Sequence, residues 1–290
     1  MTQRTAVPPV GLVGAGRAGT ALAAALRGAG VELTGVLARS ELSRRRAGDA
    51  LPGVPVLGPG ALPELTGRAG LVLLAVPDDA LPELAGRLAR RPGQVVVHTS
   101  GRYGVAVLGA PGGRAAAHPC MTFPGAPDDA ARVAGTTFGV TADDDARPVV
   151  EALVAAVGGR VELVAEELRP LYHAALANAA NHLVALVAQS ADWLRAAGVA
   201  AAPDALAPLV TAALAGALDR GDAALTGPVA RGDAGTVEAH LAALRAAGAP
   251  PAAVAAYVAM AALTAERARA AGLLDDDRMA ALRAVLARVT

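Results

Sequence analysis

The sequence contains no lysine, and all 26 basic residues of the 290-residue chain are arginine. No lysine side chain can therefore act as a general acid or form a Schiff base in this protein. Acidic residues also number 26, so the formal net charge is zero. Nucleic-acid-binding proteins usually carry a basic excess or a basic stripe. The longest basic run here, Arg44-Arg45-Arg46, is more typical of a solvated face, and we expect no nucleic-acid partner.

Cysteine occurs once, at Cys120, which excludes a disulfide framework and favours a reducing compartment. We interpret Cys120 as a buried thiol, because no paired Cys/His signature accompanies it. The first residues show no charged-then-apolar leader pattern. Apolar stretches such as Leu71–Val76 are far shorter than the roughly 20 residues of a membrane span. The histidines form no zinc pattern, so we expect a cytoplasmic protein without a membrane partner or a metal site.

The first 160 residues alternate short apolar runs with helical patterns, which is typical of βαβ units and a parallel sheet. Strands are expected at 10–14, 33–38, 71–76, 94–98, 115–118, 137–140 and 161–164. The pattern of the rest of the chain predicts Ala/Leu-rich helices at about 166–197, 203–219, 235–247, 252–271 and 275–288. We expect stops, breaks and turns at Gly198, Pro208, 248–251 and Gly272. We therefore predict an α/β Rossmann domain with a mostly parallel sheet at 1–160. An all-α helical domain follows at 161–290, with the boundary placed within about ten residues.

A glycine-rich loop, Gly14-Ala15-Gly16-Arg17-Ala18-Gly19, follows the first predicted strand and opens a helix. In this context the pattern G-x-G-x-x-G predicts dinucleotide binding. Gly14 allows the tight turn, Gly16 lets the pyrophosphate approach the backbone, and Gly19 lets the helix and strand pack closely. The helix N-terminus adds free N–H groups and a partial positive charge. All six residues are therefore candidates for binding the cofactor.

The end of the second predicted strand favours NADP(H) over NAD(H). A NAD enzyme places Asp or Glu about 20 residues after the glycines, where it binds the ribose 2′-hydroxyl. No acid is present in that stretch, which reads Val36-Leu37-Ala38-Arg39-Ser40. Arg39 and Ser40, with Arg44 as further help, can instead bind a 2′-phosphate through charge-assisted hydrogen bonds. A surface arginine after a strand is the alternative for Arg39.

Two further predicted strands end in residues that should face the same crevice. Val76 and Pro77 follow the third strand, and His98-Thr99-Ser100-Gly101 follows the fourth. Ligands of open α/β sheets bind beyond the carboxyl ends of the strands, so Val76, Pro77 and Ser100 are cofactor-binding candidates. An ordinary capping or turn role for Thr99 and Ser100 is the alternative.

Several motifs recur together in this order and carry a family resemblance. They are Gly14–Gly19, Ala75–Asp78, His98–Gly101, His118–Phe123, Leu171–Ala175, Asn181–Leu186 and Leu225–Asp233. Over nearly its whole length the chain resembles a bacterial family of Rossmann-like proteins whose helical C-terminal half is a domain of unknown function. That family is similar, more distantly, to ketopantoate reductases, pyrroline-5-carboxylate reductases and β-hydroxyacid dehydrogenases. The resemblance implies a homodimer formed through the helical domain, with the substrate between the two domains.

The resemblance also directs attention to the first long helix of the second half. Ketopantoate reductases carry a Lys-x-x-x-Asn-x-x-x-Asn pattern there, and matching its last Asn to Asn181 places His173 at the lysine position and Ala177 at the middle Asn. On an uninterrupted helix, with 100° per residue, His173 and Asn181 lie on one side, and Asn178 lies about 60° from Asn181. We expect His173 and Asn181 to be catalytic, with His173 donating the proton that reduction of C=O or C=N requires. A polar helix–helix contact is the alternative for His173.

Other polar residues complete the predicted site. His118 begins a loop after a predicted strand and is a candidate proton donor or substrate anchor, with a structural role as the alternative. Thr226, Arg231 and Asn178 are candidates for binding substrate, because Arg231 can hold a carboxylate with two hydrogen bonds. An Arg231–Asp233 contact is the alternative for Arg231.

Together these features predict an NADPH-dependent reductase of a small carboxylate-bearing carbonyl compound. Ketopantoate is the best single substrate, because some members of the resembled family are thought to be alternative ketopantoate reductases in pantothenate biosynthesis. Two alternatives stay open. One is an imine reductase that acts on a pyrroline-type substrate, and the other is a non-catalytic NADP-binding sensor, which the missing lysine allows.

Overall fold

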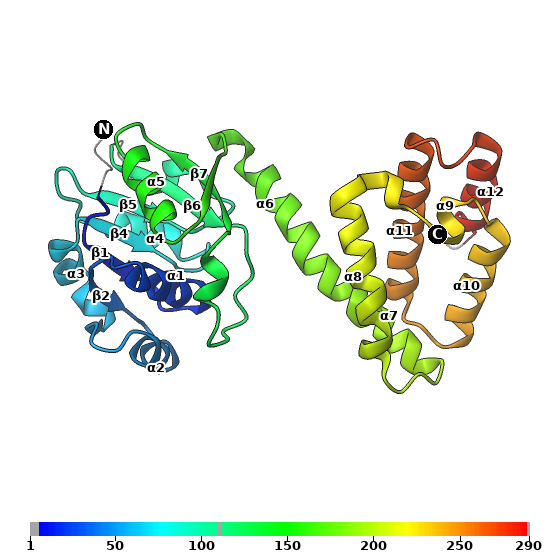
Figure 1. The fold of residues 1–290 in the computed structure, drawn as a ribbon, viewed down its shortest axis with the longest axis horizontal. Helices are drawn as coiled ribbons and strands as arrows, with labels where there is room; N and C mark the ends of the chain where they lie inside the picture. Colours follow the sequence, from blue (N-terminus) through cyan, green and yellow to red (C-terminus); the bar gives the residue numbers. More distant parts are fainter. Residues whose placement is uncertain (1–5, 110–111, 289–290) are drawn as a thin grey trace. The chain divides into compact units, whose positions relative to one another are not determined.

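The computed structural model describes residues 6–109 and 112–288 of the chain, and Figure 1 shows its fold. The chain divides into two compact units, Met1–Ala180 and Asn181–Thr290. The first contains the sheet and the second is helical. The domain boundary near residue 160 stays a prediction.

Eight strands form one sheet in the first unit, in the order β3-β2-β1-β4-β5-β6-β7-β8 (Figure 1). They are β1 (Val10–Val13), β2 (Leu33–Leu37), β3 (Val56–Leu57), β4 (Leu71–Leu74), β5 (Val95–His98), β6 (Arg114–Pro119), β7 (Thr137–Ala142) and β8 (Arg160–Leu163). Neighbouring strands are parallel except β6 and β7, which are antiparallel. The predicted Rossmann domain with a mostly parallel sheet is confirmed. The two-residue strand β3 was not predicted.

The central strands are buried on both faces, which explains why they read as continuous apolar runs. In β4, Leu71 and Leu73 belong to one hydrophobic core, while Val72 and Leu74 belong to the other. The first core also takes side chains from α1 (Arg17–Gly28) and α5 (Arg147–Ala156). The second takes them from α3 (Leu62–Arg68) and α4 (Leu81–Gly86). Helix α2 (Glu41–Ala50) contributes Ala47 to the first core.

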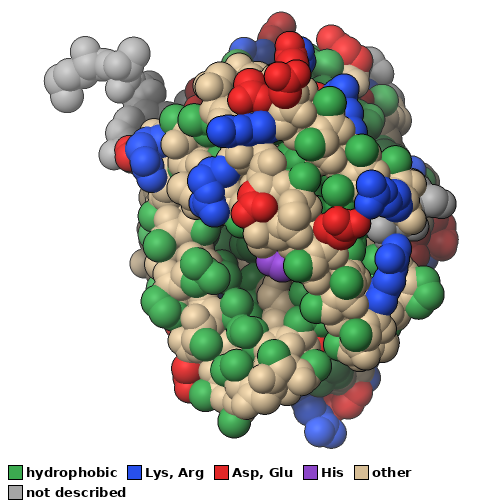
Figure 2. Space-filling view, turned by 90° about the vertical axis from the view of Figure 1, so that its right-hand side faces the viewer, with side chains coloured by type: hydrophobic (Ala, Val, Ile, Leu, Met, Phe, Trp, Pro, Cys, Tyr) green, Lys and Arg blue, Asp and Glu red, His purple; other side chains and the backbone are tan. Residues whose placement is uncertain are grey.

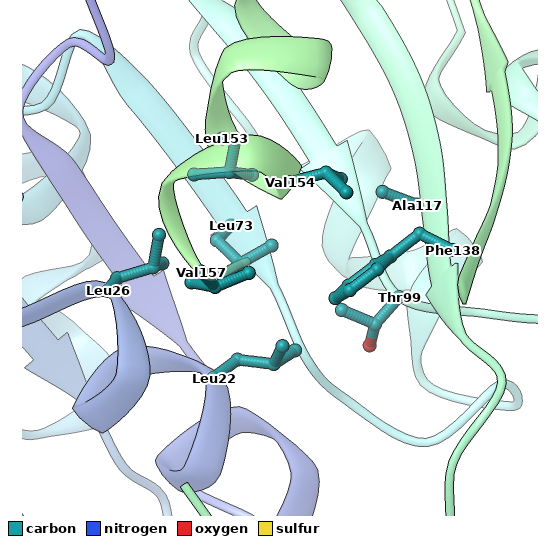
Figure 3. A pocket seen from close by; sticks show the side chains of 9 residues that line it. All are labelled: Leu22, Leu26, Leu73, Thr99, Ala117, Phe138, Leu153, Val154 and Val157. Carbon is teal, nitrogen blue, oxygen red and sulfur yellow. The ribbon is translucent and has the colours of Figure 1, made fainter. Parts of the chain in front are cut away.

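Figure 3 shows where α1 and α5 meet the first face of the sheet. Leu22 and Leu26 of α1 and Leu153 and Val154 of α5 point toward the same small cavity. Its volume is about 20 Å³ and Thr99 is its one polar lining residue. A water molecule in such a space needs two or more polar partners, so we interpret the cavity as a packing feature of the core and not as a ligand site.

The segment that follows β8 is anchored on the sheet unit by two charged side chains. It comprises the 3-10 turn η4 (Glu166–Leu168) and helix α6 (Arg169–Ala177). The carboxylate of Glu166 accepts the backbone N–H groups of Val105, at 2.7 Å, and Ala106, at 3.1 Å, which open the 3-10 turn η2 (Val105–Leu108). Arg169 is fully buried. Its Nη2 donates to the carbonyl of Ser100 at 2.7 Å, and its Nη1 donates to Thr141 Oγ1 at 3.0 Å.

The helical unit confirms the predicted all-α half of the chain. Its helices are α7 (Leu183–Ala196), α8 (Ala202–Arg220), α9 (Gly227–Ala230), α10 (Ala234–Ala246), α11 (Pro251–Ala270) and α12 (Asp276–Leu286). The core that joins α9 to α12 consists mainly of Ala, Val and Leu, as the low aromatic content implies. Pro208, which was expected among the stops and breaks, lies inside α8, whose residues Ala202 and Leu206 are buried with Ala191 of α7. None of the described helices combines the length and apolar character that crossing a bilayer requires.

The long helix expected at 166–197 is interrupted. It begins with a 3-10 turn, and residues Asn178–His182 form a π-helix between α6 and α7. A π-helix bonds residue i to i+5 and so contains more residues per turn than an α-helix. The rule of 100° per residue therefore does not extend from His173 to Asn181, and the expectation of an uninterrupted helix is wrong.

Candidate functional site

The glycine loop lies at the point where the order of the sheet reverses. From β1 the chain passes to β2 and β3 on one side, and β4 then lies on the other side of β1. Open α/β sheets bind ligands at this switch point, beyond the carboxyl ends of the strands. The loop follows β1 directly, and Ala75 and Val76 follow β4. The predicted cofactor residues Gly14 to Gly19, Val76 and Pro77 are therefore brought to one edge of the sheet.

The three glycines of the loop differ in their surroundings. Gly14 has a φ of +102°, and a Cβ there would overlap the carbonyl oxygen of Ala75. A Cβ on Gly19 would overlap the carbonyl oxygen of Gly14 and lie 2.8 Å from the Cβ of Ala75. Gly16 is exposed, and a Cβ there would meet no atom within 4 Å. Gly14 and Gly19 thus allow close packing of β1, α1 and β4, whereas Gly16 leaves open space at the N-terminus of α1.

The three residues predicted to bind a 2′-phosphate are in different situations. Ser40 is the N-cap of α2, where its Oγ accepts the N–H of Ser43 at 3.2 Å. Arg44 pairs with Glu41 at 2.8 Å and donates to the carbonyl of Arg39 at 3.2 Å. Arg39 is exposed, and in the described part of the chain its guanidinium has no hydrogen bond or ion pair. Of the three side chains, that of Arg39 is the most available to an anion.

Two other arginines approach the glycine loop, and sequence reasoning missed one of them. Arg46, which we took as part of a solvated run, directs Nη1 toward the carbonyl oxygen of Ala15 at 3.5 Å. Arg17, the fourth residue of the loop, has its side chain against Gly125. Both line a cavity of about 640 Å³ between α1, α2 and residues 125–130, together with Arg45. These guanidinium groups place positive charge beside the loop, although Asp49 and Asp129 line the same cavity.

The turn after β5 is built around a buried histidine. His98 Nε2 donates to the carbonyl of Gly104 at 2.9 Å, and its Nδ1 accepts the N–H of Ser100 at 3.2 Å. Burial lowers the pKa of His98 to about 4, so the ring is neutral at pH 7. The hydroxyl of Ser100 accepts the N–H of Tyr103 at 3.1 Å. Ser100, which was predicted to bind the cofactor, is buried and has this turn contact.

Four side chains of β6, the residue after it and α6 form a polar cluster in the sheet unit. The hydroxyl of Tyr172 lies 2.9 Å from Nδ1 of His118 and 2.9 Å from Sγ of Cys120. The rings of His118 and His173 meet edge to face, with centroids 6.0 Å apart. The predicted candidates His118 and His173 are thus neighbours. Tyr172 was missed, although it stands next to His173 in the Leu171–Ala175 motif.

Burial makes the centre of this cluster uncharged at neutral pH. The pKa of His118 falls to about 4, mainly because burial disfavours the imidazolium, and His173 and Arg169 lower it further. Burial and the hydrogen bond with Cys120 raise the pKa of Tyr172. His118 and Tyr172 are therefore both neutral at pH 7 and can only exchange hydrogen bonds.

The remaining candidates are exposed residues at or beyond the π-helix. Asn178 and Asn181 lie within it, and Asn181 opens the helical unit. Thr226 precedes α9. Asp233 caps α10, where it accepts the N–H of Thr236 at 3.0 Å. Arg231 and Asp233 form no ion pair in the described residues, so the guanidinium of Arg231 is not held by this acid.

No group of three His, Cys, Asp or Glu residues in the described part of the chain is arranged to hold a metal ion. The residues best placed to bind a ligand or take part in a reaction are those of the glycine loop and of the His118–Tyr172–Cys120–His173 cluster. The loop and strand order define the class of Rossmann dinucleotide-binding proteins.

Family models place the chain more closely. Residues 2–124 match a Rossmann-like domain, and residues 136–264 match a domain of unknown function (DUF2520). The chain therefore combines a Rossmann-like domain with this C-terminal domain, as the resemblance of its sequence motifs predicted. No curated protein matches the chain.

Solved structures share the fold across most of the chain. A Bacteroides fragilis protein classed as an NADP oxidoreductase is 24% identical, with a TM-score of 0.74, and covers 90% of this chain and 98% of its own. Protein TM1727 of Thermotoga maritima is 23% identical, with a TM-score of 0.67 and the same coverage. Pyrroline carboxylate reductase of Plasmodium falciparum, solved with NADP bound, is 10% identical, with a TM-score of 0.57 and 97% coverage of both chains.

Buried His98 and half-buried His118 predict a loss of stability in mild acid. His98 and His118 have pKa values of about 4 in the folded chain, below the ordinary 6.5. As the pH falls below 6.5 the unfolded chain binds protons first, so each histidine should lower the free energy of unfolding by about 1.4 kcal/mol per pH unit until about pH 4. Urea unfolding between pH 7.5 and 4.5 measures this slope. His98→Gln and His118→Gln should each make it shallower, and a flat wild-type profile would contradict the assignment.

Proposed function

We propose that the protein is an NADP(H)-dependent oxidoreductase that reduces a small carboxylate-bearing carbonyl compound. The single observation that supports it most is the glycine loop. Gly16 faces open space at the N-terminus of α1, where backbone N–H groups and the helix dipole favour a pyrophosphate. Ketopantoate is the first substrate to test, given the family resemblance of the sequence.

NADP(H) is the proposed cofactor because the end of β2 carries Arg39 and no acid. An exposed guanidinium without a partner can bind a 2′-phosphate without first breaking an ion pair. The NADP bound to the Plasmodium pyrroline carboxylate reductase, which has this fold, supports the same choice. Ser40 caps α2, so in this proposal it contributes mainly by fixing the start of that helix.

His173 is the proposed proton donor, and His118 lies beside it. The two rings are in contact at the carboxyl edge of the sheet, next to Gly101. Hydride transfer from NADPH leaves a developing anion that must receive a proton, and an imidazolium can donate it near neutral pH. Asn181, Asn178, Thr226 and Arg231 stay proposed as residues that orient the substrate.

An imine substrate of the pyrroline type is the second candidate. The pyrroline carboxylate reductase of Plasmodium falciparum shares the fold over 97% of both chains. A C=N bond needs the same hydride and proton as a C=O bond, so the histidine cluster serves either substrate.

A cytoplasmic homodimer formed through the helical domain also stays a proposal. Leucines on α8 support it, since Leu209 is 65% and Leu218 81% exposed. Figure 2 shows that hydrophobic side chains are spread over the viewed face of the helical unit, between charged ones.

Cofactor choice is tested by Arg39→Gln, with Arg27→Gln as the matched control. Both remove one exposed arginine charge, but Arg27 lies in the last turn of α1, far along the helix from the glycine loop. Loss of a charge-assisted hydrogen bond should weaken NADPH binding roughly tenfold or more and change NADH binding little. Titration calorimetry with both cofactors measures this, and equal effects on NADPH and NADH would contradict the 2′-phosphate role.

Turnover is tested by following NADPH absorbance with a panel of 2-oxo acids, including ketopantoate, and cyclic imines. His173→Ala should lower kcat roughly 100-fold or more, with little change in NADPH affinity. His240→Ala, an exposed histidine in the helical unit, is the control and should retain wild-type kcat. An unchanged kcat in His173→Ala would exclude His173 as donor. Binding of NADPH without turnover of any panel member would favour a sensor.

A further inference from the structure

We propose that Tyr172 holds His118 in the tautomer with its proton on Nε2, so that neutral His118 donates a hydrogen bond to the carbonyl oxygen or imine nitrogen of the substrate. This inference rests on the proposed reductase function and assigns a positioning role to Tyr172. His118 thereby becomes a substrate-binding donor, and His173 remains the source of the proton.

The tautomer follows from the hydrogen bonds of one hydroxyl group. The Oη of Tyr172 lies 2.9 Å from both Nδ1 of His118 and Sγ of Cys120. A hydroxyl has one proton to donate, and the possible acceptors of this one are Nδ1 and Sγ at 2.9 Å and the carbonyl oxygen of His118 at 3.5 Å. When Oη donates to Nδ1, which is the nearest good acceptor, the single proton of the neutral ring must be on Nε2.

The reverse direction is weaker for chemical reasons. It would require Nδ1 of His118 to donate to Oη, with Oη donating either to the sulfur or, over the longer distance of 3.5 Å, to the carbonyl oxygen of His118. Sulfur is a weak acceptor, whereas an imidazole nitrogen is a good one. A doubly protonated His118 is excluded at neutral pH, because burial lowers the pKa of this ring to about 4.

The backbone at Gly139 leaves room for the ring of Tyr172. A Cβ on Gly139 would overlap the ring of Tyr172, so the absence of a side chain there lets the ring approach β7. The guanidinium of Arg169, which begins the same helix α6, lies 5.7 Å from the centroid of the ring. Arg169 is itself fixed by its hydrogen bond to the carbonyl of Ser100, so Tyr172 is positioned both by β7 and by the anchored start of α6.

The edge of the His118 ring that carries Nε2 and Cδ2 faces the turn after β5. A Cβ on Gly101 would lie 3.1 Å from Nε2 of His118 and 2.6 Å from Cδ2 of His173. Any larger residue at position 101 would therefore cover both histidines. Strand β5 pairs with β4, so this turn stands at the same carboxyl edge of the sheet as the glycine loop.

The proposed roles account for every proton and electron. A bound NADPH would supply the hydride, which carries two electrons, to the substrate carbon and would leave as NADP⁺. The C=O or C=N π bond breaks, and its electron pair takes a proton from the ring of His173. His118 keeps its proton throughout, and its Nε2–H stabilises the charge that develops on oxygen or nitrogen.

Two-bond ¹H–¹⁵N spectra of the full-length protein, labelled with ¹⁵N-histidine, report the tautomer of each ring at pH 7.5. His118, assigned by loss of its signals in His118→Gln, should show a protonated Nε2 and a bare Nδ1. In Tyr172→Phe the signals should move toward a mixture of tautomers. The matched control is Tyr257→Phe, which removes the hydroxyl 2.8 Å from Nδ1 of His240 in the helical unit and should move only the signals of His240.

The same variants separate a positioning role from a structural one. Tyr172→Phe should lower kcat roughly tenfold, the effect of one lost orienting hydrogen bond, with KM for NADPH within about twofold. Tyr257→Phe should retain wild-type kcat. Cys120→Ala leaves the Tyr172–His118 bond in place, so it should keep the Nε2–H tautomer even if Tyr172→Phe fails to fold.

Three results would overturn the inference. The first is a wild-type His118 with its proton on Nδ1, and the second is a His118 tautomer that changes to Nε2–H only in Cys120→Ala. The third is an equal kcat for Tyr172→Phe and Tyr257→Phe. If the wild-type protein oxidises no NADPH with any panel substrate, the proposed reductase function fails separately. The donor role is then judged by adding pyruvate with NADP⁺, and an unmoved His118 Nε2 signal would contradict it.

Discussion

The close approach of the glycine loop to the end of β4 is the constraint on which the rest of the structure depends. Gly14 and Gly19 have no side chains where a Cβ would overlap backbone or meet Ala75. This contact sets the N-terminus of α1 against the switch point between β1 and β4. Its unpaired N–H groups, together with Gly16, therefore face the crevice where an anionic cofactor can bind. Without it, α1 would stand away from the sheet and the anion site would lose its position.

A second constraint places the polar cluster at the same edge of the sheet. Buried Arg169 and the carboxylate of Glu166 hold η4 and α6 on backbone groups of the turn after β5. A buried guanidinium is costly unless its donors are satisfied. The carbonyl of Ser100 and the hydroxyl of Thr141 accept from its two Nη groups, whereas its Nε has no hydrogen-bond partner in the described residues. The helix that carries Tyr172 and His173 is therefore fixed against His118, although these residues are more than 50 positions apart in the chain.

Local patterns in the sequence were enough to predict the parallel strands, the glycine loop and the helical half, because each depends on nearby residues. Strand β3 was missed since two residues carry no periodic pattern. The π-helix at Asn178–His182 was missed because an Ala-rich segment reads as a continuous α-helix. Ser40 was considered for phosphate binding, yet Ser43 three residues later is the capping signal that places it at the start of α2. Tyr172 was missed because its partners His118 and Cys120 come from β6 and the residue after it, and one sequence does not show which distant residues meet.

The most direct measurement compares Gly16→Ala with Gly14→Ala for stability and for NADP⁺ binding. Gly16 has an ordinary φ of −71° and open space around it, so Gly16→Ala should cost less than about 1 kcal/mol of unfolding free energy. It should nevertheless weaken NADP⁺ binding roughly tenfold or more, because the new methyl group occupies the approach of the pyrophosphate. Gly14→Ala should instead lower the unfolding free energy by at least about 2 kcal/mol. Unchanged NADP⁺ affinity in a folded Gly16→Ala protein would contradict the account.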